Sequence, residues 1–254
     1  MTVDSSSDPS SDQRQEGVDP ALVGRVSEAL EAHAERVRSL AAELHRTPEV
    51  GGAELHSVTR LVGELEEESF EVETGLAGLP TSFRARYGDA NPRTRIALLA
   101  EYDAIPGLGH ACGHNLLCAA SYGAAVALSS VAKELQGQVA VVGAPAEETF
   151  GGKVVLAREG VFEHTDVALL AHPGDAERAI VPSNASWSFE VCFEGRSAHA
   201  VASPESGVNA LDAMVQLFNG RDMLLKALGA GVSMHAATTG SQYTDARRVS
   251  VYHF

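Results

Sequence analysis

A short aliphatic run that leads into a loop of cysteine and histidine constrains this chain more than any other stretch. Residues 96–100 are apolar without interruption, and a loop rich in Gly and Pro then carries His110, Cys112 and His114. Such a run is typical of a strand buried on both faces, as in parallel sheets flanked by helices. Ligands bind beyond the carboxyl ends of such strands, so a thiol and two imidazoles there indicate a metal site.

The composition excludes several classes of function. The chain has 254 residues, of which 44% are hydrophobic, and a formal net charge of −15. Nucleic acids and anionic membrane surfaces attract Lys and Arg, so neither is an expected partner. No window approaches the roughly 20 apolar residues that a membrane span needs, and no secretory signal is visible. Three cysteines form no disulfide framework, and we expect a cytoplasmic protein.

The sequence predicts an acidic tail followed by helices and strands in alternation. Residues 1–19 are rich in Ser and Asp and predict a disordered acidic tail. Helical spacing of apolar residues predicts a helix from Pro20 and a second over 54–68, followed by strands over 70–73 and 82–87. Buried strands are then predicted at 96–100, 139–142 and 167–171, with helices over 115–135 and from residue 153 to 158. This alternation predicts an α/β domain over residues 20–184, with a mainly parallel sheet between two helical layers.

The pattern changes after residue 184. Residues 186–193 alternate between apolar and polar side chains, as a strand with one wet face does, and a helix over 207–228 follows. We therefore place a domain boundary near residues 183–186 and a second domain over 185–254.

Candidate metal ligands follow three successive strands. Cys112 and His114 come after the first buried strand, Glu147 and Glu148 after the second, and His172 after the third. Carboxyl ends of parallel strands meet at one edge of a sheet, so these side chains are expected to converge. Thiolate, imidazole and carboxylate together suit zinc, with manganese or cobalt as alternatives, and five donors would serve one or two ions.

Simpler interpretations exist for each residue. Cys112 would pack as a small hydrophobe, Glu147 and Glu148 would be a solvated pair beside a helix start, and His172 would end a strand. His110 and Asn115 would be a loop histidine and a helix N-cap. A thiol hydrolase with Cys112 as nucleophile and His114 as base is a further alternative, which leaves both glutamates unexplained.

Four motifs in order carry a family resemblance. They are EYDAIPGLGHACGHN, GAPAEETFGGKVVLAREGVF, the turn at residues 172–174, and FEGRSAHAVASPESGVNALDA. Together they resemble the M20 metallopeptidases, and within them the amidohydrolase and aminoacylase branch. That branch includes aminobenzoyl-glutamate hydrolase-like and peptidase M20 domain-containing protein 2-like dipeptidases. The resemblance covers about residues 44–216.

The resemblance implies a fold and a site. The first domain would be catalytic, and the second an inserted α+β lid and dimerisation domain. The implied metal ligands are Cys112, His114, Glu148 and His172. The implied general base is Glu147, Asp103 would orient a ligand imidazole, His199 would steady a substrate carboxylate or oxyanion, and the same lid motif offers Asn209 for substrate binding.

The implied activity is metal-dependent hydrolysis of amide bonds in small N-acyl amino acids or dipeptides, by a homodimer with one or two ions. Family members continue well beyond this length, and the pattern fades after Leu228. Neither His235 nor His253 stands in the motif expected of a further ligand. The alternative is therefore a truncated, catalytically weak or inactive remnant that still binds metal.

Overall fold

The structure is a computed structural model that describes residues 18–181, 185, 189–229, 231–239 and 246–252. The chain divides into two compact units, Met1–Ala176 and Glu177–Phe254, and each is described by itself. The tail predicted over residues 1–19 falls almost wholly outside the described residues, as does most of the boundary predicted at 183–186. The domain names that the sequence suggested stay predictions.

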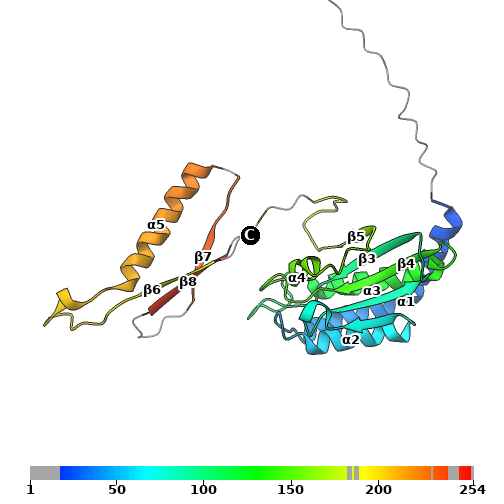
Figure 1. Cartoon of the computed structure of the whole chain (residues 1–254), viewed down its shortest axis with the longest axis horizontal. Coiled ribbons are helices and arrows are strands. Elements are labelled where there is room, and N and C mark those ends of the chain that lie inside the picture. The colour runs from blue at the N-terminus through cyan, green and yellow to red at the C-terminus, as the bar shows by residue number, and fades with distance from the viewer. Residues whose placement is uncertain (1–17, 182–184, 186–188, 230, 240–245, 253–254) are drawn as a thin grey trace, which may run out of the picture. The chain divides into compact units, whose positions relative to one another are not determined.

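The first unit is built on a five-stranded sheet in the order β1-β2-β4-β3-β5 (Figure 1). The strands are β1 (Glu71–Thr74), β2 (Phe83–Gly88), β3 (Thr94–Ala100), β4 (Gly137–Gly143) and β5 (Val167–Leu169). Strands β4, β3 and β5 are parallel, whereas β1 with β2 and β2 with β4 are antiparallel. The α/β class is confirmed, in a mixed sheet whose parallel part is the three strands expected to carry the site.

Helices cover both faces of this sheet. They are α1 (Pro20–Arg46), α2 (Leu55–Glu67), α3 (His114–Ala132) and α4 (Gly152–Arg158), with a short 3₁₀ turn η1 (Leu76–Gly78). The main core lies between α1, α2, α3 and one sheet face, and includes Leu44, Leu65 and Tyr122. A smaller cluster on the other face packs Ala97 and Leu156 with η1. Strand residues therefore alternate between two cores, which fixes the register of β3.

Helix α3 is a core helix in this unit. By length and composition it is the one helix in the described part of the chain that could cross a membrane, although the sequence analysis expected no such window. Two-thirds of that window is buried inside the protein, against α1 and the sheet. Its apolar character is that of a helix packed on most sides.

Strand β5 departs from its prediction. The sequence predicted a third buried strand over residues 167–171, but β5 has three residues, and Val167 and Leu169 are about half exposed. In the described structure β5 pairs only with β3, so it forms an edge of the sheet.

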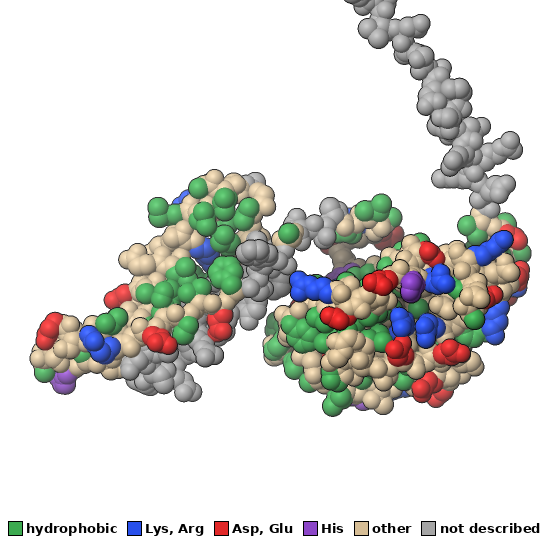
Figure 2. Space-filling view, in the orientation of Figure 1, with side chains coloured by type: hydrophobic (Ala, Val, Ile, Leu, Met, Phe, Trp, Pro, Cys, Tyr) green, Lys and Arg blue, Asp and Glu red, His purple; other side chains and the backbone are tan. Residues whose placement is uncertain are grey.

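The second unit is a three-stranded antiparallel sheet with one long helix. Its elements are β6 (Phe189–Glu194), the 3₁₀ turn η2 (Pro204–Ser206), α5 (Ala210–Leu228), β7 (His235–Thr239) and β8 (Ala246–Tyr252), in the sheet order β6-β8-β7. Large apolar side chains remain exposed on it, among them Phe189, Val215 and Met223. Figure 2 shows apolar side chains gathered on this unit.

Candidate metal centre

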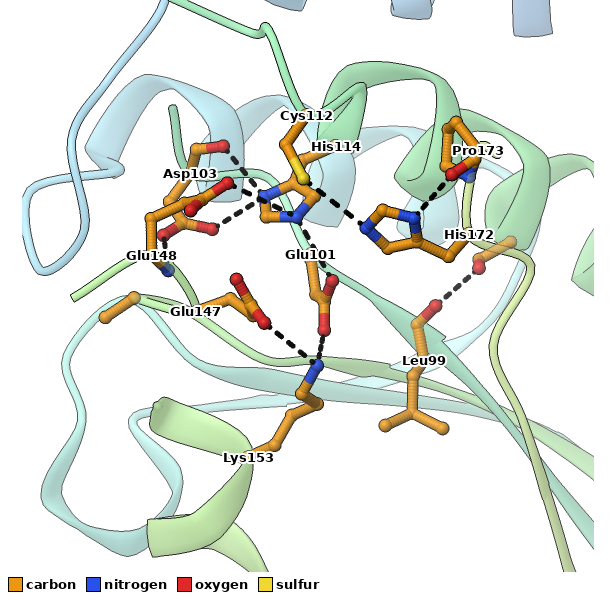
Figure 3. A network of polar contacts seen from close by, with 12 residues as sticks. Leu99, Glu101, Asp103, Cys112, His114, Glu147, Glu148, Lys153, His172 and Pro173 are labelled. Atoms are coloured by element: carbon orange, nitrogen blue, oxygen red, sulfur yellow. Dashed lines mark hydrogen bonds and ion pairs between the residues drawn. The ribbon is translucent and has the colours of Figure 1, made fainter. Parts of the chain in front are cut away.

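Three neighbouring parallel strands bring the predicted site residues together (Figure 3). The loop after β3 carries Cys112 and His114, with His114 as the first residue of α3. The loop after β4 carries Glu147 and Glu148, and His172 follows β5. Two sets of donor atoms each lie within 4.8 Å of one another: Cys112, His114 and His172 form one, and His114, Glu147 and Glu148 form the other. His114 belongs to both.

Asp103 fixes the orientation of the His114 ring. His114 Nδ1 lies 3.0 Å from Asp103 Oδ1 and 3.0 Å from the Asp103 carbonyl oxygen, which assigns the ring proton to Nδ1. Burial by itself lowers the pKa of His114, but the hydrogen bond and charge of Asp103 outweigh it and raise the pKa. The negative charge of Asp103 that favours a proton on His114 also favours a metal cation at the other ring nitrogen, Nε2.

Cys112 and His172 face each other across two loops. Cys112 Sγ lies 3.5 Å from His172 Nε2, and His172 Nδ1 lies 2.8 Å from the Pro173 carbonyl, to which it donates. Gly113 makes this approach possible, because a Cβ on it would stand 2.8 Å from Pro173 Cγ and its φ is +84°. Burial, with the nearby Glu148 carboxylate, raises the pKa of the Cys112 thiol to about 12. Without a cation this thiol therefore stays protonated at neutral pH.

The two glutamates differ in their contacts. The Glu148 backbone N–H donates to Asp103 Oδ2 at 2.9 Å, so Asp103 binds both His114 and the glutamate loop. Glu148 Oε1 lies 3.9 Å from His114 Nε2. Burial raises the pKa of Glu147, and the charge of Glu148 raises it further. One carboxylate thus faces the imidazole, and the other is biased toward holding a proton.

Glu101 and Lys153 belong to this cluster, although the sequence did not predict a role for either. Glu101 is fully buried, its Oε2 lies 3.3 Å from His114 Nε2, and Lys153 Nζ forms an ion pair with its other oxygen. Lys153 Nζ also lies 3.9 Å from Glu147 Oε1. Burial lowers the pKa of Lys153. One signal in the sequence could have identified Glu101. It is a carboxylate directly after the apolar run 96–100, and it stands two residues before Asp103, so both would lie on the same face of an extended chain.

The buried polar atoms fit a metal ion. Among the described residues, six buried side-chain atoms have no hydrogen-bond partner, and Glu101 Oε2, His114 Nε2 and Glu148 Oε1 are three of them. Buried polar atoms are nearly always satisfied, so unpartnered ones that converge need an explanation such as an ion. A thiol, two imidazoles and carboxylates match the donors that zinc prefers.

His110 and Asn115 do not join the donor set. The Asn115 side chain donates to the Ala41 carbonyl at 3.0 Å and so links α3 to α1. The alternative that Asn115 caps α3 is wrong, because Gly113 stands at the cap. His110 is buried near His45, with a distance of 6.5 Å between the ring centroids.

His199 and Asn209 lie in the second unit. The Val201 and Ala202 backbone N–H groups donate to His199 Nδ1 at 3.2 and 3.1 Å, which leaves the ring proton on Nε2. Asn209 is the N-cap of α5, where its side-chain oxygen accepts from the Leu211 N–H at 3.1 Å. Their predicted substrate roles stay predictions. His253 lies outside the described residues.

Comparison with known proteins identifies relatives of this chain. The "Xaa-Arg dipeptidase" of Mus musculus is 40% identical over 220 residues, which are 80% of this chain and 50% of that protein. A p-aminobenzoyl-glutamate hydrolase chain of Escherichia coli is 34% identical over 240 residues, 85% of this chain and 49% of that protein. The chain thus spans about half the length of these relatives.

A solved structure and a family model agree with these similarities. The YXEP protein of Bacillus subtilis, described as a dinuclear metal binding peptidase from the M20 family, has a TM-score of 0.57 at 23% identity. That match covers 88% of this chain and 65% of the other, and it shows the fold. The model of peptidase family M20/M25/M40 matches residues 91–246. The chain therefore belongs to the M20/M25/M40 family of peptidases.

Proposed function

We propose that the protein is a metal-dependent hydrolase that cleaves the amide bond of dipeptides or small N-acyl amino acids. One observation carries the proposal: His114 Nε2 and Glu148 Oε1 are buried without hydrogen-bond partners beside Cys112 and His172. The relatives named for dipeptides and aminobenzoyl-glutamate support the substrate class.

Four side chains would hold the metal. Cys112, His114, Glu148 and His172 supply sulfur, nitrogen and oxygen donors, a set that suits one or two ions of zinc, manganese or cobalt. When bound, such an ion lowers the pKa of water and polarises a carbonyl group. Asp103 and the Pro173 carbonyl hold the two imidazoles in the tautomer that presents Nε2.

Glu147 would move the proton. Burial and the charge of Glu148 raise the pKa of Glu147. A carboxyl group with a raised pKa is better able to accept a proton and then to return it. Glu147 takes a proton from the attacking water and gives it to the amine that leaves. Lys153, whose Nζ lies 3.9 Å from Glu147 Oε1 and pairs with Glu101, favours one orientation of the Glu147 carboxylate.

The second unit would contribute side chains that bind the substrate. His199 carries its proton on Nε2 and is exposed, so it is suited to donate to a substrate carboxylate or to the oxygen on which charge develops. Asn209 would assist it at the start of α5. A homodimer in which this unit serves a partner's site, and a cytoplasmic location, belong to the same proposal.

Two alternatives make different predictions. In a remnant the donor set would bind metal without turnover. A thiol hydrolase would need a Cys112 thiolate, which the raised pKa of Cys112 opposes.

Bound metal per chain is the first measurement, by elemental mass spectrometry on purified monodisperse protein. We expect one to two equivalents, and a loss in Glu148→Ala. A panel of dipeptides and N-acyl amino acids is then tested with the wild type and Glu147→Gln. Metal without turnover above that variant would favour the remnant, and folded protein without metal would refute the proposal.

A further inference from the structure

The loop between α1 and α2, residues 47–54, contacts both loops that carry the central site residues. The Ala104 N–H donates to the Glu49 carbonyl at 2.7 Å, and Val50 forms a parallel bridge with Ala104, which adjoins Asp103. A few residues later, Glu54 reaches the loop after β4. This connecting loop therefore lies against the site while contributing no donor to it.

Glu54 is a fully buried carboxylate with two specific partners. Its Oε1 accepts the Ala146 backbone N–H at 2.7 Å, and its Oε2 accepts the Thr81 hydroxyl at 2.8 Å. Although Glu54 stands at the N-cap of α2, its side chain makes no capping hydrogen bond there. Glu49 does that instead, accepting the N–H groups of His56 and Ser57. The helix therefore does not account for a buried charge at position 54.

Ala146 is the residue that Glu54 holds, and its backbone is strained. Its φ is +59°, the left-handed region that residues other than Gly and Asn rarely adopt. It is fully buried, and its carbonyl accepts the Gly151 N–H at 2.8 Å to close the loop that contains Glu147 and Glu148. The direction in which the two glutamates leave the strand is set by this turn.

Gly51 presses on the same turn. A Cβ on Gly51 would lie 2.8 Å from Ala146 Cα and 2.5 Å from Thr149 Oγ1, so the loop over 47–54 packs directly on the backbone of the glutamate loop. The strained conformation is thus held by the packing of Gly51 and by the hydrogen bond to the Glu54 carboxylate.

We propose that Glu54 is a positioning residue: its carboxylate holds Ala146 in the left-handed conformation that aims Glu147 and Glu148 at the metal. The inference rests on the proposed function. Without an acceptor, the Ala146 N–H is buried and unsatisfied, and the turn relaxes toward an ordinary conformation. The carboxylate of Glu148 then moves away from His114.

The test measures metal affinity by competition between the protein and a chromogenic chelator, with Zn²⁺ and with Co²⁺. Glu54→Leu removes both acceptors, and we expect affinity to fall about 10- to 100-fold, the range for partners that orient ligands. Glu54→Gln keeps an acceptor for the N–H and should stay within about threefold of the wild type. Thr81→Val is the matched control, since it breaks the other hydrogen bond of Glu54 and should also stay within about threefold.

A rescue separates positioning from general damage. Glycine adopts positive φ freely, so adding Ala146→Gly to Glu54→Leu should raise the metal affinity of that variant about fivefold. If Glu54→Leu does not fold, Glu54→Asp replaces it, because a side chain shorter by one methylene draws the acceptor away from the Ala146 N–H, and we expect affinity to fall in this variant as well.

Each outcome decides a separate question. Unchanged affinity in Glu54→Leu, equal loss in Thr81→Val, or no recovery with Ala146→Gly would overturn the positioning role. Equal loss in Glu54→Gln would assign the effect to charge and overturn it as well. Absence of metal from the folded wild type would overturn the proposed function itself, which the variants then do not address.

Discussion

The two units differ in how much of their apolar surface they bury. In the first, side chains from three helices and the sheet are enclosed in a continuous core, and Leu61, Leu65 and Phe83 have no exposed surface. In the second, Ala210 is the only buried apolar residue among those whose side chains are described, and Val201 is 86% exposed. Burial fixes side-chain positions, so the packed core gives the donor set a rigid support. His199 and Asn209 instead lie in a unit that has almost no buried core to hold them.

The largest expected effect tests whether the chemistry resides in the first unit. Glu147→Gln removes the group proposed to move the proton, and we expect turnover to fall roughly 10²- to 10⁴-fold with metal content unchanged. Steady-state kinetics and elemental analysis on the same preparation measure both. Full activity in this variant would mean that Glu147 is not the base.

Core substitutions sharpen the contrast in burial. Leu65→Ala in α2 leaves a cavity in a fully buried site and should lower the free energy of unfolding by about 2–5 kcal/mol. Leu224→Ala in α5, where the side chain is 47% exposed, should change it by about 0.5 kcal/mol. Hydrogen exchange resolved by peptide assigns each effect to its unit. A large loss from Leu224→Ala would mean that α5 is covered in solution.

A third prediction concerns the Cys112 thiol in chelator-treated protein. Its pKa of about 12 lowers the thiolate fraction at neutral pH roughly 10³-fold relative to free cysteine, and greater intrinsic nucleophilicity offsets part of this. Alkylation by iodoacetamide should be about a hundredfold slower than that of free cysteine, and should accelerate nearly tenfold per pH unit. Peptide mass spectrometry separates Cys112 from the exposed Cys192. Rapid alkylation at pH 7 would favour the thiol hydrolase.

A small local effect is expected at the start of α5 in the second unit. Asn209→Ala removes the cap of α5 and should cost about 1 kcal/mol, seen as faster hydrogen exchange in the first turn of that helix. Asn209→Asp keeps a capping oxygen and serves as the control. If Asn209 only caps, KM stays within about twofold in both variants. A larger rise in KM for Asn209→Asp would support its predicted contact with substrate.

The sequence predicted most of the framework because the signals are local. Uninterrupted apolar runs predicted β3 and β4 to within a few residues. Apolar residues on one helical face predicted α2, and a composition rich in Ala and Leu predicted α3. The convergence of Cys112, Glu148 and His172 followed from one rule about parallel strands. Strand β5 was predicted as buried because its composition is apolar, but burial depends on neighbours that composition does not specify.

The remaining site residues depend on contacts between distant positions. Glu54 is 92 residues from Ala146, and Lys153 is 52 residues from Glu101, so no local pattern links them. Asn115 was predicted as a cap because of its residue type, but Gly113 already occupies the cap in its left-handed conformation. Such roles are decided by packing, which the tertiary fold alone determines.

The donor set is graded in its exposure to solvent, from a fully buried His114 through a half-buried Cys112 to an exposed His172. An arriving ion would therefore meet His172 first and His114 last. His172 is free to detach without opening the core, whereas His114 is anchored by Asp103 and by the start of α3. The association rate of the ion should accordingly be governed by the outer histidine, and its residence time by the inner one.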